Sequence, residues 1–232
     1  IIILGGSGYV GSAIISFFLN KKIKVINLDN LIYDQKNKFS FSKDKNYQFI
    51  KYDLRNKNLD SNIFKDTDTI VILGSLVGDP ISNKYKKTTK SINITATKKF
   101  IEKSLKLSVK KLIFVSTCSN YGLIANNVPA KENYKLNPLS PYAKSKVDIE
   151  NFLIKKKLKK INTKIFILRF ATAFGFSERM RFDLTVNEFI KTIMQRKKLL
   201  IYDENTWRPY CHVKDFARLI YIIFNSMKKT KF

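Results

Sequence analysis

Tyr142 and Lys146 form a pair of side chains that could move a proton. They are four residues apart in a predicted helix, with Ser140 as its N-cap and Pro141 at its first position, so both project from one face. Thr117 ends a predicted strand shortly before them. A Tyr–Lys pair by itself is usually a surface contact. The strand-end hydroxyl and a nucleotide-binding turn at the start of the chain favour a chemical role.

The phenol needs help to act as a base. A tyrosine has a pKa near 10, and lowering it by about three units takes roughly 4 kcal/mol of differential stabilisation. A lysine ammonium close by has the sign required to lower that pKa.

The first eleven residues predict a phosphate-binding turn. Residues 1–4 are large and apolar, as in a strand buried on both faces, and they lead into Gly5-x-x-Gly8-x-x-Gly11 and an amphipathic helix. Glycines let the backbone approach an anion, and the helix N-terminus offers unpaired N–H groups. Asp29 closes the next predicted strand, where a carboxylate accepts the ribose hydroxyls of NAD and repels the 2′-phosphate of NADP. The alternative is a glycine turn that merely joins a strand to a helix.

The remaining elements predict an α/β fold, a Rossmann-like doubly wound parallel sheet with helices on both faces. The strand end at Asp53 would lie near the adenine ring. At the strand end Gly74-Ser75, small side chains would let the protein backbone contact the cofactor. We expect residues 1–174 to form the NAD-binding domain and 175–232 the start of a smaller C-terminal substrate-binding region with interleaved sheet elements. The predicted strands are 1–4, 24–28, 47–52, 68–73, 111–116, 163–170 and 199–202. The predicted helices are 91–107, 187–196 and 215–227, and 82–90 is expected to be a loop.

Composition narrows the function further. With 232 residues and 44% hydrophobic content, the chain has the make-up of a globular protein, and no apolar run is long enough to cross a membrane. The net charge of +26 comes from lysines scattered along the chain, including Lys159-Lys160. We interpret them as solvated faces that favour anionic substrates, so no nucleic acid is expected. Cys118 and Cys211 have no disulfide or metal-ligand spacing, and with no signal peptide visible a cytoplasmic protein is predicted.

Several motifs occur together in the order typical of one family. They are Gly5-x-x-Gly8-x-x-Gly11, Asp29-Asn30-Leu31, Asp53-Leu54-Arg55, Ser116-Thr117, Tyr121-Gly122, Tyr142-x-x-x-Lys146 and Arg208-Pro209-Tyr210-Cys211-His212-Val213-Lys214-Asp215. From residue 1 to about 216 the chain resembles the extended short-chain dehydrogenase/reductases. Within them it is similar to the NAD-dependent epimerase/dehydratase family of nucleotide-sugar enzymes, of the UDP-glucose 4-epimerase type.

The resemblance implies a role for each matching position. Thr117, Tyr142 and Lys146 would be catalytic, with Tyr142 taking a proton from a sugar hydroxyl while hydride passes to NAD. The implied cofactor-binding residues are Gly5, Gly8, Tyr9, Val10, Gly11, Asp29, Asn30, Asp53, Leu54, Leu73, Gly74, Ser75, Asn93, Tyr142 and Lys146. Those implied for the substrate, a nucleotide-diphosphate sugar, are Thr117, Thr172, Asn187 and Arg208. The helix carrying Tyr142 would form a homodimer surface.

The departures from the family pattern separate the alternatives. Dehydratases of this kind carry Asp-Glu after the strand-end Thr, where Cys118-Ser119 stand here, so C4 epimerisation through a 4-keto intermediate is the leading hypothesis. An NAD(P)-dependent 4-ketosugar reductase or a dehydratase of the same family is the alternative within the enzymes, and a non-catalytic dinucleotide-binding or RNA-associated module is the alternative outside them. We interpret His212 as structural. Residues 179–185 are either a substrate loop or only the crossing into the second region. Relatives continue through more of the substrate region, so a fragment is also considered.

Overall fold

The fold is built on one parallel sheet. The computed structural model describes residues 1–33, 39–56, 58–107, 109–124, 129–157, 161–201 and 204–226. In this described part the main sheet has six strands in the order β3-β2-β1-β4-β5-β6, with every neighbouring pair parallel. Its strands are β1 Ile2–Leu4, β2 Val25–Asp29, β3 Tyr47–Lys51, β4 Thr69–Ile72, β5 Lys111–Thr117 and β6 Lys164–Phe170.

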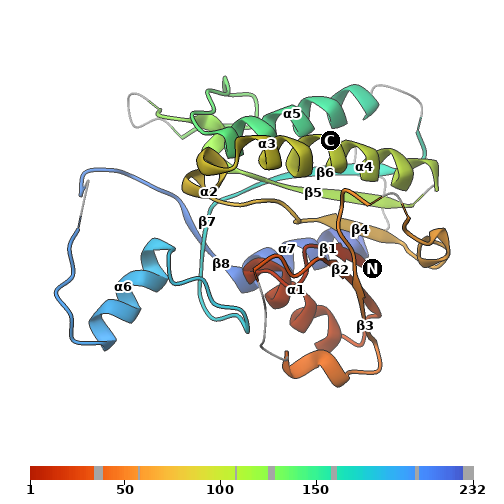
Figure 1. Cartoon of the computed structure of the whole chain (residues 1–232), viewed down its shortest axis with the longest axis horizontal. Helices are drawn as coiled ribbons and strands as arrows, with labels where there is room; N and C mark the ends of the chain where they lie inside the picture. The colour runs from red at the N-terminus through yellow and green to blue at the C-terminus, as the bar shows by residue number, and fades with distance from the viewer. Residues whose placement is uncertain are drawn as a thin grey trace.

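The apolar strands are buried on both faces because helices cover each side. Along β1, Ile3 faces the layer of helices α1 (Tyr9–Asn20) and α7 (Val213–Asn225), whereas Ile2 and Leu4 face the opposite layer. Figure 1 shows α1 and α7 below the sheet. Helix α7 therefore covers the part of this face that α1 leaves open, although it lies about 200 residues further along the chain.

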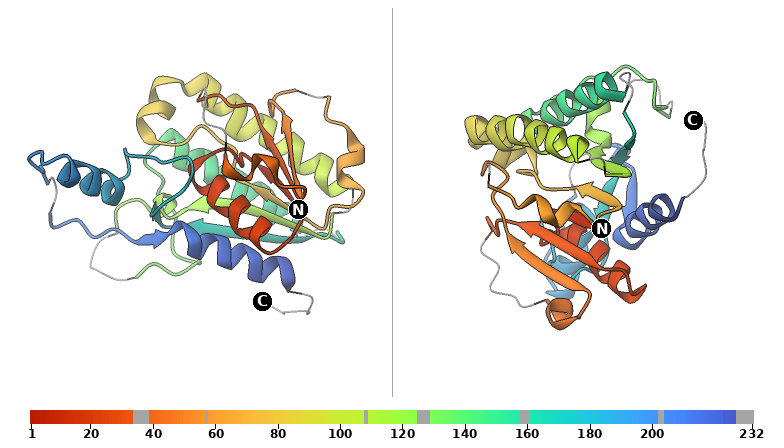
Figure 2. Two further views of the ribbon diagram at one scale, coloured as in Figure 1. Left: turned by 90° about the horizontal axis from the view of Figure 1, so that it is seen from below. Right: turned by 90° about the vertical axis from the view of Figure 1, so that its right-hand side faces the viewer.

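The other layer contains the helix with the Tyr–Lys pair. It consists of α2 (Asp79–Lys84), α3 (Lys86–Thr89), the π-helix η3 (Lys90–Ala96), α4 (Thr97–Lys106) and α5 (Pro141–Lys157). The right-hand view of Figure 2 shows these helices on one side of the sheet. The expected cap of α5 is present, since the backbone N–H of Ala143 donates to Ser140 Oγ at 3.1 Å.

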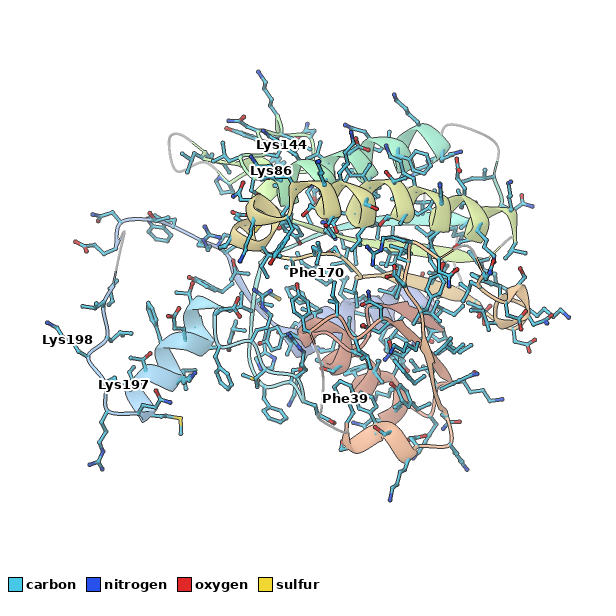
Figure 3. All side chains as sticks on the ribbon, in the orientation of Figure 1. Phe39, Lys86, Lys144, Phe170, Lys197 and Lys198 are labelled. Carbon is cyan, nitrogen blue, oxygen red and sulfur yellow. The ribbon has the colours of Figure 1, made fainter. Side chains whose placement is uncertain are left out.

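A smaller set of elements follows β6. Strand β7 (Thr172–Phe174) pairs in parallel with β8 (Tyr210–His212), and α6 (Thr185–Met194) projects away from the main sheet (Figure 1). Short helical turns complete the described elements: η1 (Ser40–Lys43), η2 (Ser61–Phe64) and η4 (Cys118–Tyr121). Phe170, at the end of β6, stacks on Phe216 of α7 with ring centroids 3.8 Å apart, and Figure 3 shows it at the centre of the molecule.

The structure confirms the predicted fold class and corrects two local predictions. Residues 82–90 are helical, and the prediction of a loop was wrong. The side chains that α2 and α3 bury, Ser82 and Thr89, are small and polar, so the sequence shows no apolar period there. Residues 199–201 form no strand, since no other strand pairs with them, and Leu200 and Ile201 stay exposed. Tyr202, Met227 and Lys159-Lys160 lie outside the described residues.

The four lysines labelled in Figure 3 lie on solvated faces, as predicted. Lys86 on α3, Lys144 on α5, and Lys197 and Lys198 after α6 are exposed and point outward in Figure 3. Within the described ranges, no helix is both long and apolar enough to cross a membrane.

Candidate active site

The candidate site lies where the strand order reverses. Strand β1 has β2 on one side and β4 on the other, so the connections leave in opposite directions and open a crevice at the carboxyl ends of these strands. A cavity of about 610 Å³ occupies this crevice. Of the residues predicted for the site, those that line it are Gly5, Gly8, Tyr9, Val10, Gly11, Asp29, Asn30, Asp53, Leu54, Leu73, Gly74, Ser75, Thr117, Tyr142, Lys146, Thr172 and Arg208.

The glycine turn has the close packing that a phosphate-binding turn needs. Gly5 has a φ of +81°, and a Cβ placed on it would lie 2.5 Å from the Cα and N of Gly74, at the end of β4. A Cβ on Gly11 would lie 2.6 Å from the carbonyl oxygen of Gly5. Helix α1 starts after Gly8 with no side chain capping its N-terminus. The first N–H groups of α1 therefore face the cavity and are available to an anion.

Asp29 lines the cavity at the end of β2. Its Oδ2 accepts from the N–H of Ser7 at 3.0 Å and its Oδ1 from the N–H of Leu31 at 2.9 Å, which ties the end of β2 to the glycine turn. Burial raises the pKa of this carboxyl, and these two hydrogen bonds and the charge of Arg179 oppose the increase. Each oxygen keeps a lone pair for a ribose hydroxyl. The residues present thus fit the adenosine half of a dinucleotide.

Asp53 lies on the same side of the cavity but is already paired. The Arg55 guanidinium donates to it at 2.6 Å and lowers the pKa of the Asp53 carboxyl to about 2. Asn93 is predicted at the cofactor and does not line the cavity. Its amide spans the backbone of Leu76, with Oδ1 accepting from the N–H at 2.8 Å and Nδ2 donating to the carbonyl at 3.0 Å. Asn93 therefore supports the wall after β4 from behind.

Thr117, Tyr142 and Lys146 converge on the opposite wall. Thr117 is the last residue of β5 and its Oγ1 accepts from the N–H of Ser119 at 3.2 Å. Lys146 is 5% exposed, and its ammonium donates to the carbonyl of Val115 at 2.9 Å. The same Nζ lies 5.7 Å from the centroid of the Tyr142 ring. The three side chains predicted from the sequence are thus brought together in the cavity that the glycine turn also lines.

The pKa of Tyr142 does not follow the expectation that the nearby Lys146 ammonium lowers it. Burial raises the pKa of Tyr142, the charge of Arg181 opposes this increase, and Cys118 and Asp79 raise the pKa further. Burial also lowers the pKa of Lys146 to about 8, with the charge of Glu150 opposing that change. The chain by itself therefore does not prepare the phenol as a base.

The cavity is also lined by residues that the motifs do not assign. Residues 179–184, between β7 and α6, all line the cavity. A contact between this stretch and substrate stays a prediction. Arg181 lies close enough to Tyr142 to influence its pKa, and its guanidinium pairs with Asp183 at 2.5 Å. The sequence signal for a role of this stretch is its two arginines, Arg179 and Arg181. Only the fold shows that Arg181 lies near the phenol of Tyr142.

Asn187 lies in the wall behind the cavity. It is 4% exposed, its Oδ1 accepts from the N–H of Gly175 at 3.1 Å, and its Nδ2 donates to the phenol of Tyr9 and the carbonyl of Arg181, both at 3.0 Å. The Tyr9 phenol in turn donates to the carbonyl of Gly175 at 2.6 Å. This network joins the glycine turn to the segment that carries Arg181. A direct contact between Asn187 and substrate stays a prediction.

A model of the NAD dependent epimerase/dehydratase family matches residues 1–231. The chain belongs to this family. Over 221 residues it is 28% identical to a putative UDP-glucose 4-epimerase of Methanocaldococcus jannaschii, covering 94% of this chain and 71% of the relative. The family membership confirms the predicted family, the enzyme class and the dependence on NAD.

Two solved structures add the fold-level comparison. A UDP-N-acetylglucosamine 4-epimerase from Methanobrevibacter ruminantium, in complex with UDP-N-acetylmuramic acid, is 28% identical with a TM-score of 0.87, over 98% of this chain and 73% of that one. A UDP-glucuronic acid 4-epimerase from Bacillus cereus, in complex with UDP-glucuronic acid and NAD, is 27% identical with a TM-score of 0.83, over 98% and 73%. The predicted homodimer and the absence of nucleic-acid partners stay predictions.

Proposed function

We propose that this chain catalyses C4 epimerisation of a nucleotide-diphosphate sugar, with NAD as the hydride carrier and Tyr142 as the base. The observation that carries the proposal is the meeting of Thr117, Tyr142 and Lys146 with the β1 glycine turn in one cavity. The names of the relatives, which are UDP-sugar 4-epimerases, support the same class of substrate.

The cofactor would occupy the crevice between the glycine turn and α5. The N–H groups at the start of α1 would hold its pyrophosphate, Asp29 its adenosine ribose and Lys146 its nicotinamide ribose. When bound, NAD supplies the acceptor and later the donor of a hydride, and a positive ring charge that lowers the pKa of a neighbouring phenol. That charge opposes the effect of burial on Tyr142.

The side chains of α5 and β5 then divide the proton transfer. Tyr142 would take the proton of the C4 hydroxyl as that carbon is oxidised to the 4-keto sugar, and Thr117 would hold the same oxygen by a hydrogen bond. After the keto sugar turns over, Tyr142 would give the proton back as C4 is reduced on its other face. The product is the C4 epimer, and no cofactor is consumed. Arg208 and Thr172 line the cavity where the diphosphate would lie, and a guanidinium binds phosphate oxygens in bidentate fashion.

The test is turnover of a panel of UDP-sugars by the purified protein with NAD. Tyr142→Phe removes only the hydroxyl, and we expect turnover to fall by at least about 100-fold, the contribution typical of general acid–base catalysis. Lys146→Met should also lose activity. The matched controls are Tyr85→Phe and Lys144→Met, which change exposed residues of the same helical layer and should retain wild-type turnover.

Equal turnover by Tyr142→Phe and the wild type would refute the role of the phenol. Net consumption of reduced cofactor with a 4-ketosugar would indicate a reductase instead, because an epimerase regenerates its cofactor in each cycle.

A further inference from the structure

A buried carboxylate lies one helical turn beyond Lys146. Glu150 is 1% exposed, on the same face of α5 as Tyr142 and Lys146, since the three residues are spaced by four. None of the chemistry proposed above uses it. A carboxylate that is taken out of water needs several strong partners to remain charged.

Glu150 has those partners on three other elements, β5, η4 and β6. Its Oε1 accepts from Ser116 Oγ at 2.5 Å and from Asn120 Nδ2 at 2.7 Å, and its Oε2 accepts from the Arg169 guanidinium of β6 at 2.7 Å. Arg169 also donates to the phenol oxygen of Tyr121 at 2.9 Å. These hydrogen bonds satisfy both oxygens of the carboxylate. Ser116 directly precedes Thr117, and the network therefore fixes the strand end that carries the predicted catalytic hydroxyl.

Lys146 needs a nearby negative charge more than an exposed lysine does. Its Nζ lies 4.8 Å from the centroid of the Phe114 ring and its one hydrogen bond among the described contacts is to a neutral carbonyl. Burial favours the neutral amine. A neutral amine would neither attract the developing phenolate of Tyr142 nor hold a ribose oxygen as strongly as an ammonium does.

We propose that Glu150 is a positioning residue of the active site, which keeps Lys146 in its ammonium form and anchors the Ser116–Thr117 strand end. This inference rests on the proposed function, because Lys146 and Thr117 act on the reaction and Glu150 acts through them. The Arg169 guanidinium forms an ion pair with Glu150 at 2.7 Å and holds its carboxylate in place.

The charged and titratable groups around this wall come from several elements. Those facing Lys146, Glu150 or Tyr142 are Arg169 on β6, Tyr121 and Cys118 on η4, Asp79 on α2 and Arg181 before α6. Among those named, Glu150 is the group that raises the pKa of Lys146.

The experiment measures the pKa of Lys146 by NMR titration of lysine-labelled protein without sugar or cofactor, its signal assigned from its absence in Lys146→Met. Glu150→Gln keeps the size of the side chain and an acceptor for Ser116 and Asn120 but removes the charge. In Glu150→Gln the charge of Arg169 is no longer balanced by a carboxylate and repels the Lys146 ammonium. The pKa of Lys146 should therefore fall by about one pH unit. Arg169→Met breaks the same ion pair and keeps the carboxylate, and the pKa should not fall.

The sign of the change separates this role from a structural one. If Glu150 only held α5 against the sheet, its loss would admit water and the pKa of Lys146 would stay or rise toward 10.5 in both variants, which would overturn the proposal. Should Glu150→Gln fail to fold, Glu150→Asp draws the charge back by one methylene and should lower the pKa in the same direction. The measurement needs no turnover, so a failure of the epimerase proposal would not imitate either result.

Discussion

Replacing Gly5 by alanine tests whether the crevice at the strand reversal is set by backbone contact. Gly5 follows β1 and Gly74 follows β4, and the N–H of Gly74 donates to the carbonyl of Leu4 at 2.8 Å. An added Cβ on Gly5 would lie 2.5 Å from the Gly74 backbone, closer than carbon atoms pack, and Gly74 cannot turn aside as a flexible side chain would. The ends of β1 and β4 must then separate.

The expected loss has two parts. Gly5 has a φ of +81°, where a Cβ costs about 1–3 kcal/mol, and overpacking a rigid contact costs about 1–3 kcal/mol more. Gly78 supplies the matched control, because its φ is +100° but a Cβ there would meet nothing within 4 Å. Gly78→Ala should therefore lose the conformational part alone, about 1–3 kcal/mol.

Urea denaturation followed by circular dichroism gives the free energy of unfolding of each variant, and titration calorimetry gives its affinity for NAD. We expect Gly5→Ala to be less stable than Gly78→Ala by about 1–3 kcal/mol, and to bind NAD more weakly because the turn has moved. If the two variants lose equal stability, the contact between Gly5 and Gly74 does not restrain the strand ends and the reasoning is wrong.

Three further predictions follow from single residues. Asp29→Asn should weaken NAD binding by about tenfold, a hydrogen bond to a charged group being worth about 1.5–3 kcal/mol, and should narrow the preference for NAD over NADP; unchanged affinities for both would contradict it. Tyr9→Phe removes one of the two acceptors of the buried Asn187 Nδ2 and should lower the free energy of unfolding by about 1–3 kcal/mol, whereas Tyr85→Phe should not. Lys146 releases its proton near pH 8 when folded and near 10.5 when unfolded, so the unfolded state binds more protons in between. The stability of the wild type relative to Lys146→Met should therefore rise over that pH range, and a flat or falling difference would refute a lowered pKa.

The local parts of the fold could be predicted because local residues specify them. The β1 turn, α1 and Asp29 belong to one continuous strand–helix–strand unit, in which the apolar period, the glycines and the acid stand at fixed offsets. The N-cap of α5 is likewise specified by Ser140 and Pro141. The helices at 79–89 were missed because they bury Ser82 and Thr89, whose polar side chains give no hydrophobic period.

The contacts across the cavity could not be predicted in this way. The phenol of Tyr9 and the amide of Asn187 are 178 positions apart, and no spacing rule connects them. Arg181 lies near Tyr142 only because the segment after β7 folds back over the crevice. The ion pair between Glu150 and Arg169 likewise requires α5 to lie on β5 and β6.

The sequence by itself determined the parallel α/β architecture, the dinucleotide-binding turn and the Tyr–Lys pair, because each depends on residues close together along the chain. The tertiary structure alone decided which charges surround that pair, since these come from separate elements whose packing no local pattern encodes. Burial, which depends on the whole fold, then decided that the pKa of Lys146 is lowered and that of Tyr142 raised.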